Sequence, residues 1–177
     1  AENWELIDRA PKIKALRVGE QQYDCLSPEE LQKLISCDGE PLFQAMIRLA
    51  VNTGLRYGEL SGLKWTDIDF QRKQLTVRHN IVNGNMTTPK SGKTRDIPLN
   101  EEVLAALDST EPLGEFVFMT NKGTPMYDNK ALTAIKRICE KAGIRKVTWH
   151  VLRHTFATNV ALSGVPLLVL QKLMGHS

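Results

Sequence analysis

The chain has 177 residues, 42% of them hydrophobic, and a formal net charge of +3, so it can bury one core, and its total charge alone does not indicate nucleic-acid binding. Its three cysteines are odd in number and form no CxxC pair, which argues against a disulfide framework and a structural zinc site and favours a reducing compartment. The charged first residues are unlike a signal peptide and the apolar run 167–170 is too short for a bilayer, so we expect a soluble, cytoplasmic protein with no membrane partner.

The first third of the chain predicts an arm followed by two helices. Residues 1–22 show no sustained hydrophobic periodicity and are interpreted as a linker or arm from an upstream domain. Ser27-Pro28-Glu29-Glu30 is a capping-box signature and predicts a helix start. Apolar residues repeat at helical spacing from Leu42 to Thr53, and Gly54 can take the left-handed conformation that ends a helix.

The middle of the chain changes to a pattern typical of strands. Within residues 68–81 the apolar residues lie among polar ones and show little helical periodicity. Asn83-Gly84 marks a hairpin turn, and Ser91-Gly92 marks a second turn before residues 94–99. We therefore expect a small three-stranded antiparallel sheet, followed by a helix over 101–108.

Three more helices are expected in the last third. They are bounded by caps and glycines: Asp128 to Gly143, Thr148 toward Gly164, and Pro166 to Gly175. The chain is therefore predicted to be a single α+β domain that is mainly helical.

Positive charge is concentrated in residues 130–153, which hold seven Lys or Arg residues and one Glu. Because the net charge of the whole chain is +3, the remainder is negative overall. A one-sided field of this kind attracts polyanions, although a solvated helix face would carry the same pattern.

His150 and Arg153 stand three residues apart at the expected start of a helix, so they share a face. The unpaired N–H groups and the positive dipole end of a first turn favour an anion. An arginine supplies a planar fork for two phosphate oxygens, and a histidine can carry a proton near neutral pH. The pair suits phosphoryl transfer better than metal binding.

Four blocks of the sequence together resemble one family. They are 53–60 (TGLRYGEL), Lys90 in a strand turn, 150–155 (HVLRHT) and 173–177 (LMGHS). Their order, context and spacing resemble those of the catalytic domain of tyrosine recombinases, the phage-integrase family. The resemblance implies the tyrosine-recombinase catalytic fold, double-stranded DNA and other recombinase protomers as partners, and association with the nucleoid when DNA is bound.

The resemblance also implies a reaction and the residues that perform it. A tyrosine attacks a DNA phosphodiester, a 5′-hydroxyl leaves and a 3′-phosphotyrosyl link stores the bond energy, so no metal or other cofactor is implied. Arg56 and Arg153 would hold the non-bridging oxygens of the phosphate. Lys90 would protonate the leaving oxygen. His150 would accept the tyrosine proton, and His176 would hydrogen-bond a phosphate oxygen.

Neighbouring residues leave alternatives open. Lys93 lies in the same turn as the expected general acid and is the alternative for that role; otherwise Lys93 and Arg95 are expected to contact the DNA backbone. From the residues alone, Arg56 would pair with Glu59 across one helical turn. His154 is expected to be a buried, hydrogen-bonded histidine.

No tyrosine of this chain stands where the family has its nucleophile, a couple of helical turns beyond the last histidine of the motifs. The available residues are Tyr23, Tyr57 and Tyr127. We therefore expect a catalytic domain over 23–177 that is incomplete at its C-terminus, and no DNA cleavage by this chain alone.

Two other classes of function are considered. A metal hydrolase could use His150, His154 and His176 as ligands, but the Glu of an H-E-x-x-H pattern is absent and Arg153 would place a cation beside the metal. A decayed recombinase could serve as a non-catalytic DNA-binding module. Topoisomerase IB enzymes share the chemistry, but the TGLR and LMGH blocks look more like a recombinase.

Overall fold

The computed structural model describes residues 24–89, 92–127 and 129–175. The expected arm at 1–22 and the expected cap Asp128 lie outside these ranges. The helices are α1 (Pro28–Ser36), α2 (Pro41–Thr53), α3 (Tyr57–Ser61), the 3-10 turn η1 (Trp65–Asp67), α4 (Glu101–Asp108), α5 (Asn129–Lys141), α6 (Trp149–Leu162) and α7 (Leu167–Met174).

Helix α1 begins at the capping box that the sequence predicts. The Glu30 N–H donates to Ser27 Oγ (3.2 Å), and the Ser27 N–H donates to Glu30 Oε2 (2.9 Å). Two N–H groups that have no partner within the helix are thereby satisfied. The expected helix start is confirmed.

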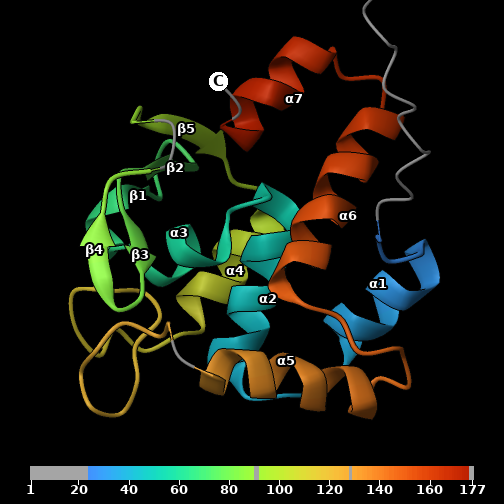
Figure 1. Cartoon of the computed structure of the whole chain (residues 1–177), viewed down its shortest axis with the longest axis horizontal. Helices are drawn as coiled ribbons and strands as arrows, with labels where there is room; N and C mark the ends of the chain where they lie inside the picture. The colour runs from blue at the N-terminus through green and yellow to red at the C-terminus, as the bar shows by residue number, and fades with distance from the viewer. Residues whose placement is uncertain (1–23, 90–91, 128, 176–177) are drawn as a thin grey trace, which may run out of the picture.

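Helix α2 lies at the centre of the molecule, where it contacts α1, α4, α5 and α6 (Figure 1). Nine of its 13 residues are buried, so the core surrounds most of its circumference. It ends, as predicted, at Gly54, which has φ +63° and whose N–H donates to the Ala50 carbonyl (3.0 Å). The chain then turns sharply into α3 and places Arg56 at the corner.

A small three-stranded antiparallel sheet is present, as expected, but its strands are not all the expected ones. Its strands are β1 (Ile68–Asp69), β2 (Gln74–Val77) and β5 (Arg95–Pro98), in the order β1-β2-β5. Leu75 of the central strand lies opposite Ile68 and Ile97, and all three are buried. The sheet thus presents one apolar face to the core.

The return strand after the Asn83-Gly84 turn does not join this sheet, which differs from the expected pairing. β3 (Asn80–Val82) and β4 (Asn85–Thr87) form a separate two-stranded hairpin. Asn83 and Gly84 have φ values of 50° and 80°, as a type I′ hairpin turn requires. β5 pairs with β2 instead.

A buried carboxylate explains why the strand expected to continue through residue 81 is interrupted. Arg78 Nη1 donates to Asp67 Oδ1 (3.0 Å), and His79 Nδ1 lies 3.2 Å from Asp67 Oδ2. Both side chains turn back to η1 because an unpaired buried carboxylate would be costly. The chain leaves the sheet at this point and re-forms strand pairing only in the hairpin.

Helix α6 packs along α2, and α7 returns from its end toward the sheet (Figure 1). Thr148 has the extended conformation of an N-cap for α6, although its side chain makes no capping hydrogen bond. Helices α6 and α7 are joined by a small cluster of Phe156, Leu170 and Met174. The C-terminal end of α7 lies against β5. In the described part of the chain, no helix has both the length and the apolar character needed to cross a membrane.

Replacing Gly54 by Ala is expected to destabilise the fold by more than the cost of placing alanine in a left-handed backbone conformation. A Cβ at Gly54 would lie 2.3 Å from Phe156 Cδ1, whereas one at Gly143 (φ +65°) would meet nothing within 4 Å. We expect Gly143→Ala to lower the free energy of unfolding by about 1 kcal/mol and Gly54→Ala by about 3 kcal/mol, measured by equilibrium denaturation. Equal losses of unfolding free energy in the two variants would show that the close approach of Phe156 does not contribute to the effect.

Candidate active site

Arg56 is placed at the corner between α2 and α3 by the helix start itself. As the residue before α3, its N–H donates to Glu59 Oε2 (2.9 Å), and its Nη1 donates to Glu59 Oε1 (3.1 Å). The side chain of Arg56 is 27% exposed, so its guanidinium remains partly accessible. The pairing expected from residue spacing is present, and it fixes Arg56 at the edge of the site.

Arg153 reaches the same place from the first turns of α6. Its Nη1 donates to the Gly54 carbonyl and its Nη2 to the Met174 carbonyl (2.6 Å). The residue is only 3% exposed. Burial, and next the charge of Arg56, lower the pKa of Arg153 to about 10, which leaves it charged at neutral pH.

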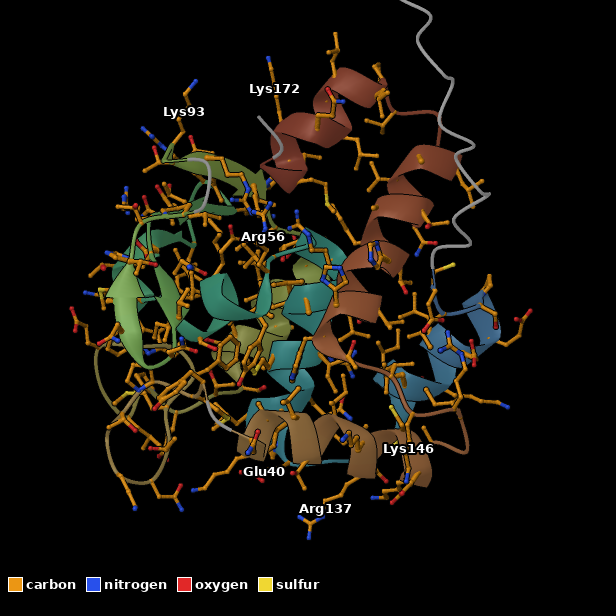
Figure 2. All side chains as sticks on the ribbon, in the orientation of Figure 1. Glu40, Arg56, Lys93, Arg137, Lys146 and Lys172 are labelled. Carbon is orange, nitrogen blue, oxygen red and sulfur yellow. The ribbon has the colours of Figure 1, made fainter. Side chains whose placement is uncertain are left out.

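The two arginines converge on the end of α7. Arg56 Nη2 lies 3.4 Å from the Gly175 carbonyl, next to the Met174 carbonyl that Arg153 binds. Figure 2 shows Arg56 in the middle of this face, below the end of α7. Segments far apart in the sequence therefore form one cationic cluster.

Arg95 is placed differently from the expected contact with the DNA backbone. Its Nη1 and Nη2 donate to Glu59 Oε1 (3.0 Å) and Oε2 (2.7 Å), and its Nε donates to the Leu173 carbonyl (2.8 Å). The side chain is 9% exposed. Three of the donors that an arginine offers are used inside the protein. The expected contact of Arg95 with the DNA backbone stays a prediction.

Glu59 is the carboxylate that holds two of these arginines, and its side chain is 1% exposed. Burial alone would raise the pKa of Glu59, but hydrogen bonds and charges from Arg95 and Arg56 outweigh burial and hold that pKa below its usual range. Each carboxylate oxygen accepts from both arginines. Glu59 therefore acts as the shared support of the cluster.

His150 lies exposed on the first turn of α6, and His154 lies one turn later. The two rings meet edge to face with centroids 4.4 Å apart. His154 is half-buried, which is less than the buried histidine expected from the sequence. Burial, with the neighbouring His150 and Arg153, lowers the pKa of His154, so this ring is mostly neutral at neutral pH.

The remaining expected site residues lie at the edge of the site or outside the described residues. Lys93 is exposed in the turn before β5, and Figure 2 shows it pointing outward on the same side as Lys172 of α7. Lys90 and His176 lie outside the described residues.

The comparisons with known proteins identify the family. Residues 25–177, which include every described element, match the sequence model of the Phage integrase family. The chain belongs to the phage integrase family.

Individual phage-integrase relatives agree with this fold. A tyrosine recombinase XerC-like protein of Caldanaerobacter subterraneus subsp. tengcongensis is 31% identical over 89% of this chain and 48% of that protein, so the chain spans about half the length of this relative. The XerA recombinase crystal structure is 32% identical, with a TM-score of 0.72 over 86% of this chain and 56% of that one. The Tn1549 transposon integrase in complex with a circular intermediate DNA is 28% identical, with a TM-score of 0.75 over 92% and 60%. The expected tyrosine-recombinase catalytic fold is confirmed.

Neither described tyrosine of this phage-integrase chain stands beyond α7. Tyr57 is half-buried and its ring stacks on Trp149, with centroids 5.8 Å apart. Tyr127 is 43% exposed beside the hairpin turn, where a Cβ on Gly84 would lie 2.8 Å from its hydroxyl. Both line a cleft of about 850 Å³ that also touches Arg56. Tyr23 lies outside the described residues.

The motifs of the phage-integrase family lead to Arg56 and Arg153 but not to what holds them. The sequence predicted Glu59 only as a surface partner of Arg56. Its position three residues after Arg56 was the one signal in the sequence for their pairing. The backbone carbonyls of residues 173–175 have no sequence signal beyond the helix-ending Gly175. These carbonyls are the part of the site that only the fold reveals.

Replacing Glu59 by Gln is expected to remove a pH-dependent part of the stability. Losing one partner of a buried pair costs about 3–5 kcal/mol at pH 7. Because the pKa of Glu59 is lower in the folded chain than in the unfolded one, its contribution is fully present above about pH 4.5 and is lost as the pH falls through the folded-state pKa. Urea denaturation at several pH values should therefore show the two proteins converging in acid.

The matched control is Glu115→Gln, which removes a carboxylate that is 61% exposed and pairs with Lys64 at 2.7 Å. An exposed pair contributes about 0–1 kcal/mol, so we expect a small loss. A difference between the Glu59 variant and the parent that stays constant from pH 7 to pH 3 would rule out the proposed ionisation of Glu59.

Proposed function

We propose that this chain is the catalytic domain of a site-specific DNA recombinase that cleaves and rejoins DNA strands through a 3′-phosphotyrosyl intermediate. The observation that supports this most strongly is the convergence of Arg56 and Arg153 on neighbouring carbonyls at the end of α7. The exposed His150 stands on the same helix as Arg153, one turn before it. Family membership supports the same conclusion.

The arginine cluster suits a phosphorus centre that gains negative charge. Arg56 and Arg95 bind the carboxylate of Glu59, and Arg153 binds backbone carbonyls close to them, so the cluster carries an excess of positive charge. Fixed N–H donors in a partly dry site stabilise a developing oxyanion more strongly than water does. By analogy with oxyanion-hole donors, each substrate-facing arginine would contribute about 3 kcal/mol to the transition state.

The remaining steps need a base and an acid. His150 would accept the proton of the attacking tyrosine, because it is exposed and a histidine exchanges protons near neutral pH. Lys90, or Lys93 in the same turn, would donate a proton to the leaving 5′-oxygen. His176 would hydrogen-bond a phosphate oxygen. The chemistry is complete without a metal ion or other cofactor.

The chain is proposed to act as part of a larger protein. Residues 23–177 would be the catalytic domain, residues 1–22 an arm from an upstream DNA-binding domain, and the nucleophilic tyrosine would lie outside 1–177. Double-stranded DNA would be the substrate, and other recombinase protomers would bind beside it. The protein would work in the cytoplasm, on nucleoid DNA.

Arg153→Ala is expected to abolish covalent attachment to DNA. The test uses the full natural reading frame and a nicked duplex selected from random DNA by binding, and it measures the protein–DNA adduct on denaturing gels. Loss of about 3 kcal/mol of transition-state stabilisation slows attachment by about 10²-fold. Arg48→Ala, on α2, is the control and should keep the parent rate.

The alternative functions predict different results in this experiment. Binding without an adduct, in a parent protein that contains its tyrosine, would favour the non-catalytic DNA-binding module. Adduct formation at the parent rate in Arg153→Ala would exclude Arg153 from the reaction. A zinc-dependent hydrolysis of the duplex would favour the metal hydrolase.

Lysines beside the site are expected to contribute to the salt dependence of DNA binding. Lys93 and Lys172 are exposed near the end of α7 and the start of β5, on one side of the site (Figure 2). Replacing either by Gln in the 177-residue chain should lower the slope of log K against log salt by about 1, measured on a non-specific duplex. Lys33→Gln, on the distant α1, should leave the slope unchanged. Equal slopes for all three variants would place the DNA elsewhere.

A further inference from the structure

We infer that Arg95 is a positioning residue, which joins the carboxylate that binds Arg56 to the end of α7 and so fixes the relative placement of Arg56 and Arg153, the two arginines proposed to hold the phosphate. This inference rests on the proposed function. The expectation from sequence was a contact between Arg95 and DNA, and the two roles make opposite predictions.

The hydrogen bonds of Arg95 point in two directions. On one side its fork binds both oxygens of Glu59 (3.0 and 2.7 Å), and the same two oxygens hold the N–H and the Nη1 of Arg56. On the other side its Nε binds the Leu173 carbonyl (2.8 Å). A single planar group therefore connects the corner before α3 with the last turn of α7.

The end of α7 is held by three arginines in succession. The carbonyl of Leu173 accepts from Arg95, that of Met174 from Arg153 and that of Gly175 from Arg56; these are carbonyls that the helix itself leaves without a partner. Moving the end of α7 would therefore move the hydrogen-bond acceptors of both Arg56 and Arg153. Arg95 binds both oxygens of Glu59 through its guanidinium, whereas Arg56 reaches them through one guanidinium nitrogen and its backbone N–H.

Gly175 provides an independent observation. Its φ is +63°, and a Cβ there would lie 2.8 Å from Arg95 Nη1, 3.1 Å from Cζ and 3.2 Å from Nε. The guanidinium is therefore packed directly against the glycine backbone.

The test compares Arg95→Lys with Arg48→Lys. Lysine keeps the charge but cannot form the two-pronged contact with a carboxylate. Arg48 has the same kinds of partner, the Glu102 carboxylate (2.7 Å) and the Ile35 carbonyl (2.6 Å), on a part of α2 away from the site. The full reading frame is assayed for the rate of adduct formation at saturating DNA and for DNA affinity against salt.

We expect Arg95→Lys to slow adduct formation at least tenfold at saturating DNA, with the affinity and salt slope within error of the parent. Arg48→Lys should change neither. Gly175→Ala, which leaves every charge in place, should slow the reaction similarly, and the double variant should be little slower than either single one because both disturb the same contact. A parent-like rate for Arg95→Lys overturns the inference. The DNA-contact role would instead be supported if Arg95→Gln bound DNA more weakly and lowered the slope of log K against log salt by about 1. Arg48→Gln should then show neither change.

A second measurement separates this inference from the proposed function. The side-chain ¹⁵Nε–H signals of Arg56 and Arg153 can be followed in the 177-residue chain without any reaction. Arg95→Lys should shift both signals, and Arg48→Lys should shift neither. If no adduct forms with any variant but these signals shift, the proposed function fails and the positioning role stands. If adducts form and the signals do not shift, the positioning role fails alone.

Discussion

The end of α7 is the point on which the site depends, because a helix leaves its last carbonyls without partners and here they are satisfied by charged donors. Residues 173–175 offer three such carbonyls in succession, and guanidinium groups from β5, α6 and the corner before α3 bind them. The apolar packing of α7 in the described structure is a small cluster of Leu170, Met174 and Phe156, with partly buried Leu173, Ala157 and Val160 packed against it. Hydrogen bonds to charged groups, each contributing about 1.5–3 kcal/mol, are therefore major anchors of this helix.

The same arrangement concentrates like charges, which is unfavourable for the fold alone. Arg56 and Arg95 share one buried carboxylate, that of Glu59. The lowered pKa of Arg153 reflects burial first and the charge of Arg56 next. Carbonyl dipoles offset only part of this repulsion. A phosphate with two negative or partly negative oxygens would relieve more of it. A cluster that is costly without an anion and favourable with one is what a phosphoryl-transfer site requires.

Local signals in the sequence predicted most elements of the fold, because each depends on a few neighbouring residues. The capping box at Ser27 and the left-handed glycines at 54 and 175 mark helix ends in the structure. The pairing of strands was less predictable, since β5 pairs with β2 across an intervening hairpin. The strand ends where Arg78 and His79 bind the buried carboxylate of Asp67, and no local sequence pattern announces that burial.

The placement of Arg95 was predictable from strand periodicity, although its position after a basic turn suggested a DNA contact. Side chains alternate between the two faces of a strand, and Arg95 is two residues before the buried Ile97, so it faces inward. An arginine that faces a core needs hydrogen-bond acceptors, and a carboxylate also neutralises its charge. In the described part of the chain the buried acids are Glu59 and Asp67, and Asp67 is held by other residues. Alternation and charge pairing together therefore lead to Glu59, and from Glu59 to Arg56, so the inner face of β5 belongs to the support of the site.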